Sequence, residues 1–163
     1  MKKTIMTFLF ASLFAIGAHA QTTPATPATP PSPATTAGNV SRVTYFDVLP
    51  GKNNEFTTFL RTHTKPILDE QVKQGLIISY SYFTKPGTEG PGDWDIGSIV
   101  TYKNYADAID FNAERGAKFN AIGLAHYGGS EDARTKANES LNGMRTVVSS
   151  YVVRGMTLNP MPK

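Results

Sequence analysis

Histidine is the side chain best suited to proton transfer near neutral pH, and His63 and His126 are two of the three histidines in this chain. His63 recurs at helical spacing with Phe56, Leu60 and Ile67, so we expect it on a helix face that packs against a sheet. There it could serve as a general base or as a ligand of haem iron. The alternative is a half-buried core histidine that is hydrogen-bonded to a backbone carbonyl.

His126 comes just before the pair Gly128-Gly129, which frees the backbone for a tight approach. We therefore expect His126 in a loop, where a rigid scaffold often presents functional residues. The alternative is an ordinary surface loop without a chemical role. Neither histidine establishes an activity by itself.

Four aromatic side chains could line a pocket for an apolar or aromatic ligand, with hydroxyl groups that orient it: Tyr80, Tyr82, Trp94 and Tyr102. Strand alternation places Trp94 and Tyr102 on one face, together with Ile96, Ser98 and Val100. The same rings could equally fill a barrel or form a dimer interface.

Several classes of site lack their residues in this sequence. The chain has no cysteine and no His-x-x-x-His pair, so we expect no metal site of the zinc type. It also lacks a Gly-x-Ser-x-Gly turn and a phosphate-binding glycine loop, so hydrolase and nucleotide-binding functions are not expected. Asp93 and Asp95 lie beside a glycine-rich loop, where carboxylates usually form turns or stay solvated.

Four segments have the composition and alternation of β-strands: residues 42–49, 76–83, 94–102 and 147–154. The first carries apolar side chains on both faces, with Val43 and Tyr45 opposite Phe46 and Val48. This pattern predicts a strand that is covered on both sides.

Helical patterns lie between these strands. The first covers about residues 53–75, and Pro66 within it should cause a kink or a break. The second runs from a cap at Asn104 to about residue 119. After the glycine pair, a third covers about residues 130–143, so the second helical region is split.

The resulting order is β-α-β-β-α-β, which defines a ferredoxin-like α+β fold with an antiparallel sheet and helices on one side. The other face of the sheet would carry tyrosines and valines. Such an apolar surface is too large for a monomer to expose comfortably, so we expect a homodimer.

The stretches Val43–Phe46, Leu49-Pro50-Gly51-Lys52, Gly75-Leu76 and Tyr102-Lys103-Asn104-Tyr105 resemble the dimeric α+β barrel superfamily, over roughly residues 40–155. The resemblance implies that two ferredoxin-like sheets pack face to face as a barrel. Members include cofactor-independent oxygenases of aromatic substrates, haem-binding or haem-degrading proteins, and domains with no known activity. The haem-degrading members use an asparagine, a tryptophan and a histidine. Trp94 and His126 could take the last two roles, whereas Asn39 precedes the expected first strand.

The N-terminus has the pattern of a secretory signal peptide over residues 1–20. Lys2 and Lys3 precede an apolar run, and Ala18-His19-Ala20 supplies small residues at the cleavage site before Gln21. We expect an exported protein in the periplasm or outside the cell. The apolar run is too short to span a bilayer, so we expect no membrane attachment after cleavage.

Residues 21–38 are rich in Thr, Pro and Ala and are expected to form a disordered linker, which leaves residues 39–163 as one domain. Cleavage would remove two of the 16 Lys and Arg residues against 13 Asp and Glu, leaving 14 − 13 = +1. Without a basic stripe, nucleic acid is not an expected partner.

The sequence therefore predicts an exported homodimer that binds a small apolar or aromatic ligand. A cofactor-independent oxygenase or a haem-handling enzyme is the first alternative. A structural dimerisation domain without catalysis is the second.

Overall fold

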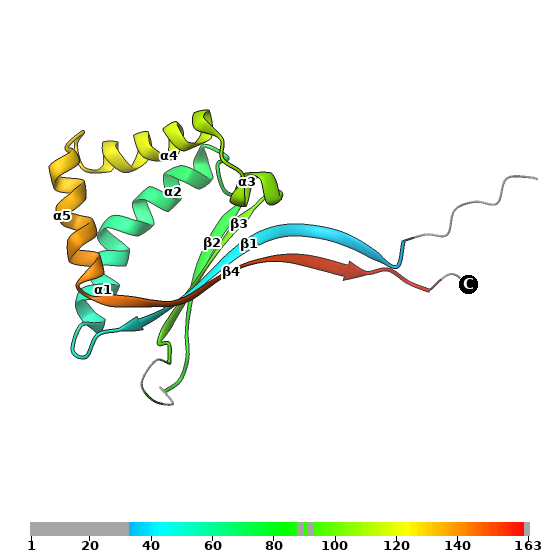
Figure 1. The fold of residues 1–163 in the computed structure, drawn as a ribbon, viewed down its shortest axis with the longest axis horizontal. Coiled ribbons are helices and arrows are strands. Elements are labelled where there is room, and N and C mark those ends of the chain that lie inside the picture. Colours follow the sequence, from blue (N-terminus) through cyan, green and yellow to red (C-terminus); the bar gives the residue numbers. More distant parts are fainter. Residues whose placement is uncertain (1–32, 88–89, 91–92, 162–163) are drawn as a thin grey trace, which may run out of the picture. The chain divides into compact units, whose positions relative to one another are not determined.

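Four strands form one antiparallel sheet in the computed structural model, which describes residues 33–87, 90 and 93–161 (Figure 1). They are β1 (Thr35–Val48), β2 (Ser79–Thr84), β3 (Ile96–Tyr102) and β4 (Arg145–Leu158), in the order β2-β3-β1-β4. This order confirms the predicted ferredoxin-like α+β fold. The predicted signal peptide and residues 21–32 of the predicted linker lie outside the described residues.

Helices cover one face of this sheet (Figure 1). They are α1 (Asn53–Phe59), the π-helical turn η1 (Leu60–Thr64), α2 (Lys65–Lys73), α3 (Tyr105–Ile109), α4 (Ala113–His126) and α5 (Glu131–Asn142). The main core cluster joins both layers and consists of Val48, Phe56, Phe59, Ile96 and Met144. Within the described part of the chain, none of the helices combines the length and the apolar character needed to cross a membrane.

β1 and β4 are both longer than their sequence patterns indicate. β1 pairs with β3 only as far as Val40, but its pairing with β4 continues to Thr35 opposite Leu158, so the two strands run on as a ribbon (Figure 1). The end of the predicted linker, residues 35–38, is therefore a strand. A Pro- and Ala-rich composition argues for a linker only where no partner strand supplies hydrogen bonds, and β4 supplies them here.

The helix around Pro66 continues through the proline by means of a widened turn. The Lys65 backbone N–H donates to the Leu60 carbonyl, five residues back, which defines η1 directly before Pro66. A proline has no N–H and crowds the carbonyl four residues before it, and the wider π-helical turn relieves both problems. The expected break at Pro66 does not occur, and a π-helical turn before the proline takes its place.

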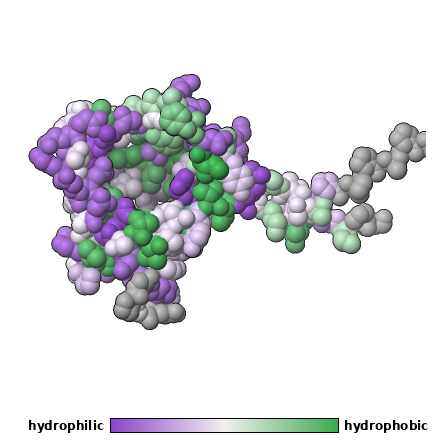
Figure 2. Space-filling view, viewed as in Figure 1, coloured by the Kyte–Doolittle hydropathy of each residue, from purple (hydrophilic) through white to green (hydrophobic). Residues whose placement is uncertain are grey.

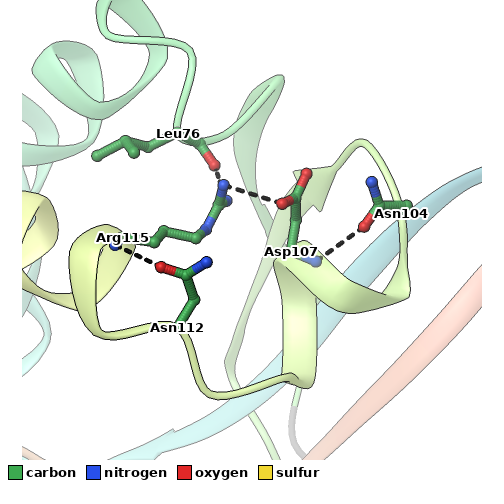
Figure 3. Close-up of polar contacts among 5 residues, drawn as sticks. All are labelled: Leu76, Asn104, Asp107, Asn112 and Arg115. Carbon is green, nitrogen blue, oxygen red and sulfur yellow. Dashed lines mark hydrogen bonds and ion pairs between the residues drawn. The ribbon is translucent and has the colours of Figure 1, made fainter.

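The helix predicted over residues 104–119 is two helices, each with its own asparagine cap. Asn104 accepts a hydrogen bond from the Asp107 backbone N–H at 2.8 Å, and Asn112 accepts one from Arg115 at 2.9 Å (Figure 3). The Arg115 guanidinium then donates to the Asp107 carboxylate at 3.1 Å and to the Leu76 carbonyl. Arg115 thereby fastens the break between α3 and α4 to the segment that leads into β2.

The sheet face opposite the helices carries an aromatic cluster. Phe46 contacts Phe56 of α1, so its neighbour Tyr45 points to the opposite face of the sheet. The Trp94 ring packs against Tyr45 and Phe83, with ring centroids 4.9 Å and 5.4 Å apart. The expectation that Trp94 lies in line with Ile96 is therefore wrong. β3 begins only at Ile96, so the strand alternation of side chains does not extend back to Trp94. The chain turns at Asp95, whose carboxylate accepts a hydrogen bond from the Val48 N–H.

Candidate functional site

The two histidines meet on the helical side of the sheet. Nδ1 of His63 lies 3.2 Å from Nε2 of His126, within hydrogen-bond distance, and one of the two nitrogens carries the shared proton. The ring planes are perpendicular, at 90°, with centroids 5.4 Å apart. Both side chains are half-buried. The structure therefore forms an imidazole pair from residues that are 63 positions apart in the chain.

Different elements position the two rings. His63 lies in η1, the turn that is widened before Pro66, and His126 is the last residue of α4. The expectation of a loop position for His126 is therefore wrong. The helix that was expected to end near residue 119 continues to His126. It ends only before the glycine pair, because Gly128 and Gly129 adopt positive φ angles, and the Tyr127 and Gly128 N–H groups donate to the Leu124 and Ala125 carbonyls.

Aromatic rings hold the His63 imidazole in place. Phe59 lies 4.7 Å away between ring centroids, and Tyr127 stacks on His63 at 5.5 Å with an angle of 22°. Tyr127 also meets His126 edge-on at 4.8 Å. Sequence reasoning missed Tyr127, although its position beside His126 was the available signal.

Burial and the neighbouring imidazole both act on the charge of His63. Desolvation first, and repulsion from His126 second, lower the pKa of His63 below its usual value of 6.5. Burial also raises the pKa of the Tyr127 hydroxyl above its usual value of 10.0, so that this group stays protonated. At neutral pH the site therefore presents an uncharged imidazole at His63 and a hydroxyl donor at Tyr127.

Two clefts share Phe59 and His63 as a common wall. The first, here called the α1 cleft, has a volume of about 400 Å³ and is lined by Asn54, Glu55, Thr58, Phe59, Thr62, His63 and Met144. The second, the α5 cleft, is smaller, about 240 Å³, and adds Tyr127, which follows α4, and Arg134 and Asn138 of α5. In Figure 2 the outer surface of α5 is hydrophilic, whereas hydrophobic residues gather in the hollow beside it. The α1 cleft is shallow and open to solvent, and its volume is comparable to that of small-molecule sites.

His126 faces a third concavity between α2 and α4. This groove has a volume of about 460 Å³, and Pro66, Ile67, Ile122 and Ala125 contribute to its walls. Its rim is polar, with Glu70, Gln74 and Lys118. His63 thus borders the α1 and α5 clefts, and His126 borders this groove.

The predicted tyrosines do not join the imidazole pair. The Tyr80 hydroxyl donates to the Asp69 carboxylate at 2.5 Å, and its ring lies against Tyr82 at 6.3 Å. Tyr82 packs on the core, and burial raises its pKa to about 12. The ring of Tyr102 lies near the Arg115 guanidinium, at 5.9 Å. None of these three tyrosines lines the α1 or α5 cleft.

Trp94 lies on the opposite face of the sheet from His126. Its ring contacts Tyr45 and Phe83, whereas the His126 ring contacts His63 and Tyr127. Trp94 and His126 therefore do not meet within one chain, although the resemblance to haem-degrading proteins would require it. Among residues 33–87, 90 and 93–161, no group of three or more His, Cys, Asp or Glu side chains could hold a metal ion.

No family model matches the chain, and no curated protein matches it. Solved structures with a similar fold include HapK from Hahella chejuensis, which is 8% identical, with 76% of this chain and 99% of that chain covered and a TM-score of 0.42. A NIPSNAP family protein of unknown function from Agrobacterium tumefaciens is 13% identical, with 77% and 93% covered and a TM-score of 0.42. A dimeric ferredoxin-like protein from an uncultured marine organism is 14% identical, with 77% and 93% covered and a TM-score of 0.40. Similarities this distant indicate no activity.

Proposed function

We propose that this protein is a binding protein for a small aromatic ligand with a hydroxyl or carboxylate group, which it holds in the α1 cleft beside His63. The observation that carries the proposal is the His63 imidazole, which lines that cleft and whose Nδ1 lies 3.2 Å from Nε2 of His126. A half-buried imidazole at the wall of a partly apolar cleft is the kind of polar group that fixes the orientation of a ligand.

The cleft supplies both parts of such a recognition site. The Phe59 ring and the Met144 side chain offer apolar and polarizable contacts for an aromatic body. His63, hydrogen-bonded to His126, can donate to or accept from the ligand's polar group, depending on which nitrogen holds the shared proton. Thr58, Thr62 and Asn54 add hydrogen-bonding groups at the edge.

We propose further that two copies associate through the sheet face opposite the helices. Tyr151 on this face is 59% exposed and Val153 is 46% exposed, and Tyr151 meets Tyr45 at 6.4 Å between ring centroids. Together with Phe83 and Trp94 these side chains form a continuous apolar and aromatic surface, which a second copy of the same sheet would cover.

The site of action proposed here is outside the cytoplasm. The support is the signal-peptide pattern of residues 1–20. Mass spectrometry of protein recovered from a cell-envelope or medium fraction tests this part, because a chain that begins at Gln21 is expected. A chain that retains Met1 in the cytoplasmic fraction would contradict it.

Calorimetric titration with a panel of phenols, hydroxybenzoates and naphthols, in the presence of a metal chelator, tests the ligand site. We expect saturable binding that is weakened at least tenfold by His63→Gln, because the imidazole no longer orients the polar group. Trp94→Phe is the matched control, because Trp94 lies on the other face of the sheet, and it should leave the affinity unchanged. Binding that is lost in Trp94→Phe and kept in His63→Gln would move the site to the aromatic face.

Haemin is a further titrant that separates this proposal from haem handling. We expect no shift of the Soret band. A shift that disappears in His126→Gln would replace the proposed ligand class by haem.

A cofactor-independent oxygenase is the second candidate, and the direct imidazole–imidazole hydrogen bond favours it. Such a pair can accept a proton from a bound phenol and pass it on, which is the role of a general base. Oxygen uptake in the presence of a compound that binds would support this candidate, provided that His63→Gln abolishes the uptake at saturating compound.

A further inference from the structure

We infer that His63 and His126 together bind one divalent transition-metal ion of the copper, nickel and zinc group, through Nδ1 of His63 and Nε2 of His126. The two nitrogens lie 3.2 Å apart. The sequence offers no recognisable metal motif, because 63 positions separate the two residues.

The distance fits a shared ion. Zinc–imidazole bonds are about 2.0–2.1 Å long, which places two nitrogens on one ion about 3.3 Å apart at the tetrahedral angle and about 2.9 Å apart at a right angle. The observed spacing of 3.2 Å lies between these values. An ion would replace the proton that the imidazoles now share, and small rotations of the two rings would direct both lone pairs at it.

The surroundings leave the remaining coordination positions open. His63 borders the α1 and α5 clefts, and His126 borders the groove between α2 and α4. Water, or a small ligand with oxygen or nitrogen donors, can therefore complete the coordination. Imidazole is a preferred ligand of Cu²⁺, Ni²⁺ and Zn²⁺, and Cu²⁺ should bind most tightly of the three.

The cationic side chains that line these three concavities are already paired. Arg134, which lines the α5 cleft, makes an ion pair with Glu131 at 2.5 Å and donates to Asn120. Lys118, at the edge of the groove beside His126, makes an ion pair with Glu114 at 2.7 Å. Their positive charge is thus largely compensated, and it does not oppose a bound cation.

This inference does not depend on the aromatic ligand proposed above. A two-histidine site can form in the absence of any organic ligand, and an aromatic compound can bind beside His63 in the presence of a chelator. The two proposals can therefore fail separately.

The test uses the tag-free chain from Gln21 onward, with Zn²⁺ and Cu²⁺ as the probes. Calorimetry with Zn²⁺ should give one site per chain. Both His63→Gln and His126→Gln should weaken binding about 100-fold, because a second imidazole in fixed position acts as a ligand of high effective concentration. The double variant should bind Zn²⁺ at most a few-fold more weakly than either single variant, because one imidazole alone forms no chelate. Asn138→Ala, at the α5 cleft, is the control and should bind normally.

Spectra of the wild-type protein give a readout that does not depend on the folding of any variant. Bound Cu²⁺ should show hyperfine coupling to two imidazole nitrogens, and Zn²⁺ should shift the ¹⁵N signals of both histidines at the same one-to-one endpoint. Coupling to a single nitrogen, or Zn²⁺ affinity that is the same in the wild type and in both single variants, would overturn the inference.

Discussion

Nδ1 of His63 lies 3.2 Å from Nε2 of His126, and this contact joins the turn between α1 and α2 to the last residue of α4. The widened turn before Pro66 and the stacked ring of Tyr127 both set the position of the His63 imidazole. π-Helical turns inside α-helices are frequent at functional sites. The backbone irregularity and the polar contact thus occur at the same residue, beside the α1 cleft.

The first prediction concerns the titration of His63. In metal-free protein, ¹⁵N NMR should give His63 a pKa below 6.5, because burial and His126 both disfavour its charged form. In His126→Gln the pKa of His63 should rise but stay below 6.5, because burial is the larger cause. Glu55 and Arg134 line the clefts beside the ring and are unchanged in this variant. A pKa of His63 at or above 6.5 in the wild type would contradict the burial of this imidazole.

The same shift makes stability depend on pH. Because the folded-state pKa of His63 is lowered, the unfolded chain binds more protons in the window between that pKa and 6.5. The stability associated with an uncharged His63 is therefore fully present above about pH 6.5, and it is lost as the pH falls through the folded-state pKa of His63. Urea unfolding at a series of pH values should show a smaller acid loss in His63→Gln than in the wild type. Equal losses would assign the acid sensitivity to other groups.

The second prediction concerns Gly97, over which the Phe83 ring lies. A Cβ at position 97 would occupy the space of that ring, so Gly97→Ala must displace Phe83 from its edge contacts with Tyr45 and Trp94. We expect a loss of about 1–3 kcal/mol in the free energy of unfolding. Gly116→Ala is the matched control, because a Cβ there meets open space inside α4, and it should stabilise by about 0.5–1 kcal/mol. Denaturant unfolding of both variants checks the prediction, and a neutral Gly97→Ala would show that the ring is not held in place.

The third prediction concerns Arg115, which ties the break between α3 and α4 to Leu76 and Asp107 (Figure 3). Its side chain is 17% exposed, so Arg115→Ala leaves a carbonyl and a carboxylate without their donor. We expect a loss of about 2–3 kcal/mol by urea unfolding. Lys118→Ala removes an ion pair from the same helix, but that lysine is 54% exposed, and the loss should stay below about 1 kcal/mol. Similar losses in the two variants would mean that the Arg115 network contributes no more than a surface pair.

The fourth prediction tests the proposed dimer. Light scattering of the chain from Gln21 onward should give the mass of two copies. Tyr151→Lys should shift the equilibrium to single chains, because it places a charge on the aromatic face. Ser140→Lys puts the same charge on the exposed surface of α5 and should leave the dimer intact. A wild-type protein that is monomeric at every concentration would contradict association through this face.

Local sequence patterns were sufficient for most of the fold. Ser130 caps α5, where its hydroxyl accepts a hydrogen bond from the Ala133 N–H. Pro66 marks the π-helical turn before α2. Both features were predictable because helix caps and proline effects depend on a few adjacent residues. The extra length of β1 depends on Leu158 and other distant residues of β4, which no local pattern reveals.

The site was predictable only in part, for the same reason. His63 and His126 could each be selected by residue type, but their contact depends on how α4 packs against the helix that contains η1. Trp94 was assigned to the wrong face because the chain turns at Asp95, so the strand alternation does not extend back to Trp94. Tyr127 has no feature in the sequence that distinguishes it from the other tyrosines, apart from its position next to His126.

The most direct test of the ligand site is a crystal structure of the chain from Gln21 onward with the tightest-binding aromatic compound from the titration panel. We expect the compound in the α1 cleft, with its ring against Phe59 and its hydroxyl or carboxylate within hydrogen-bond distance of His63. A compound bound on the aromatic face around Trp94, or a panel in which no compound binds, would contradict the central claim.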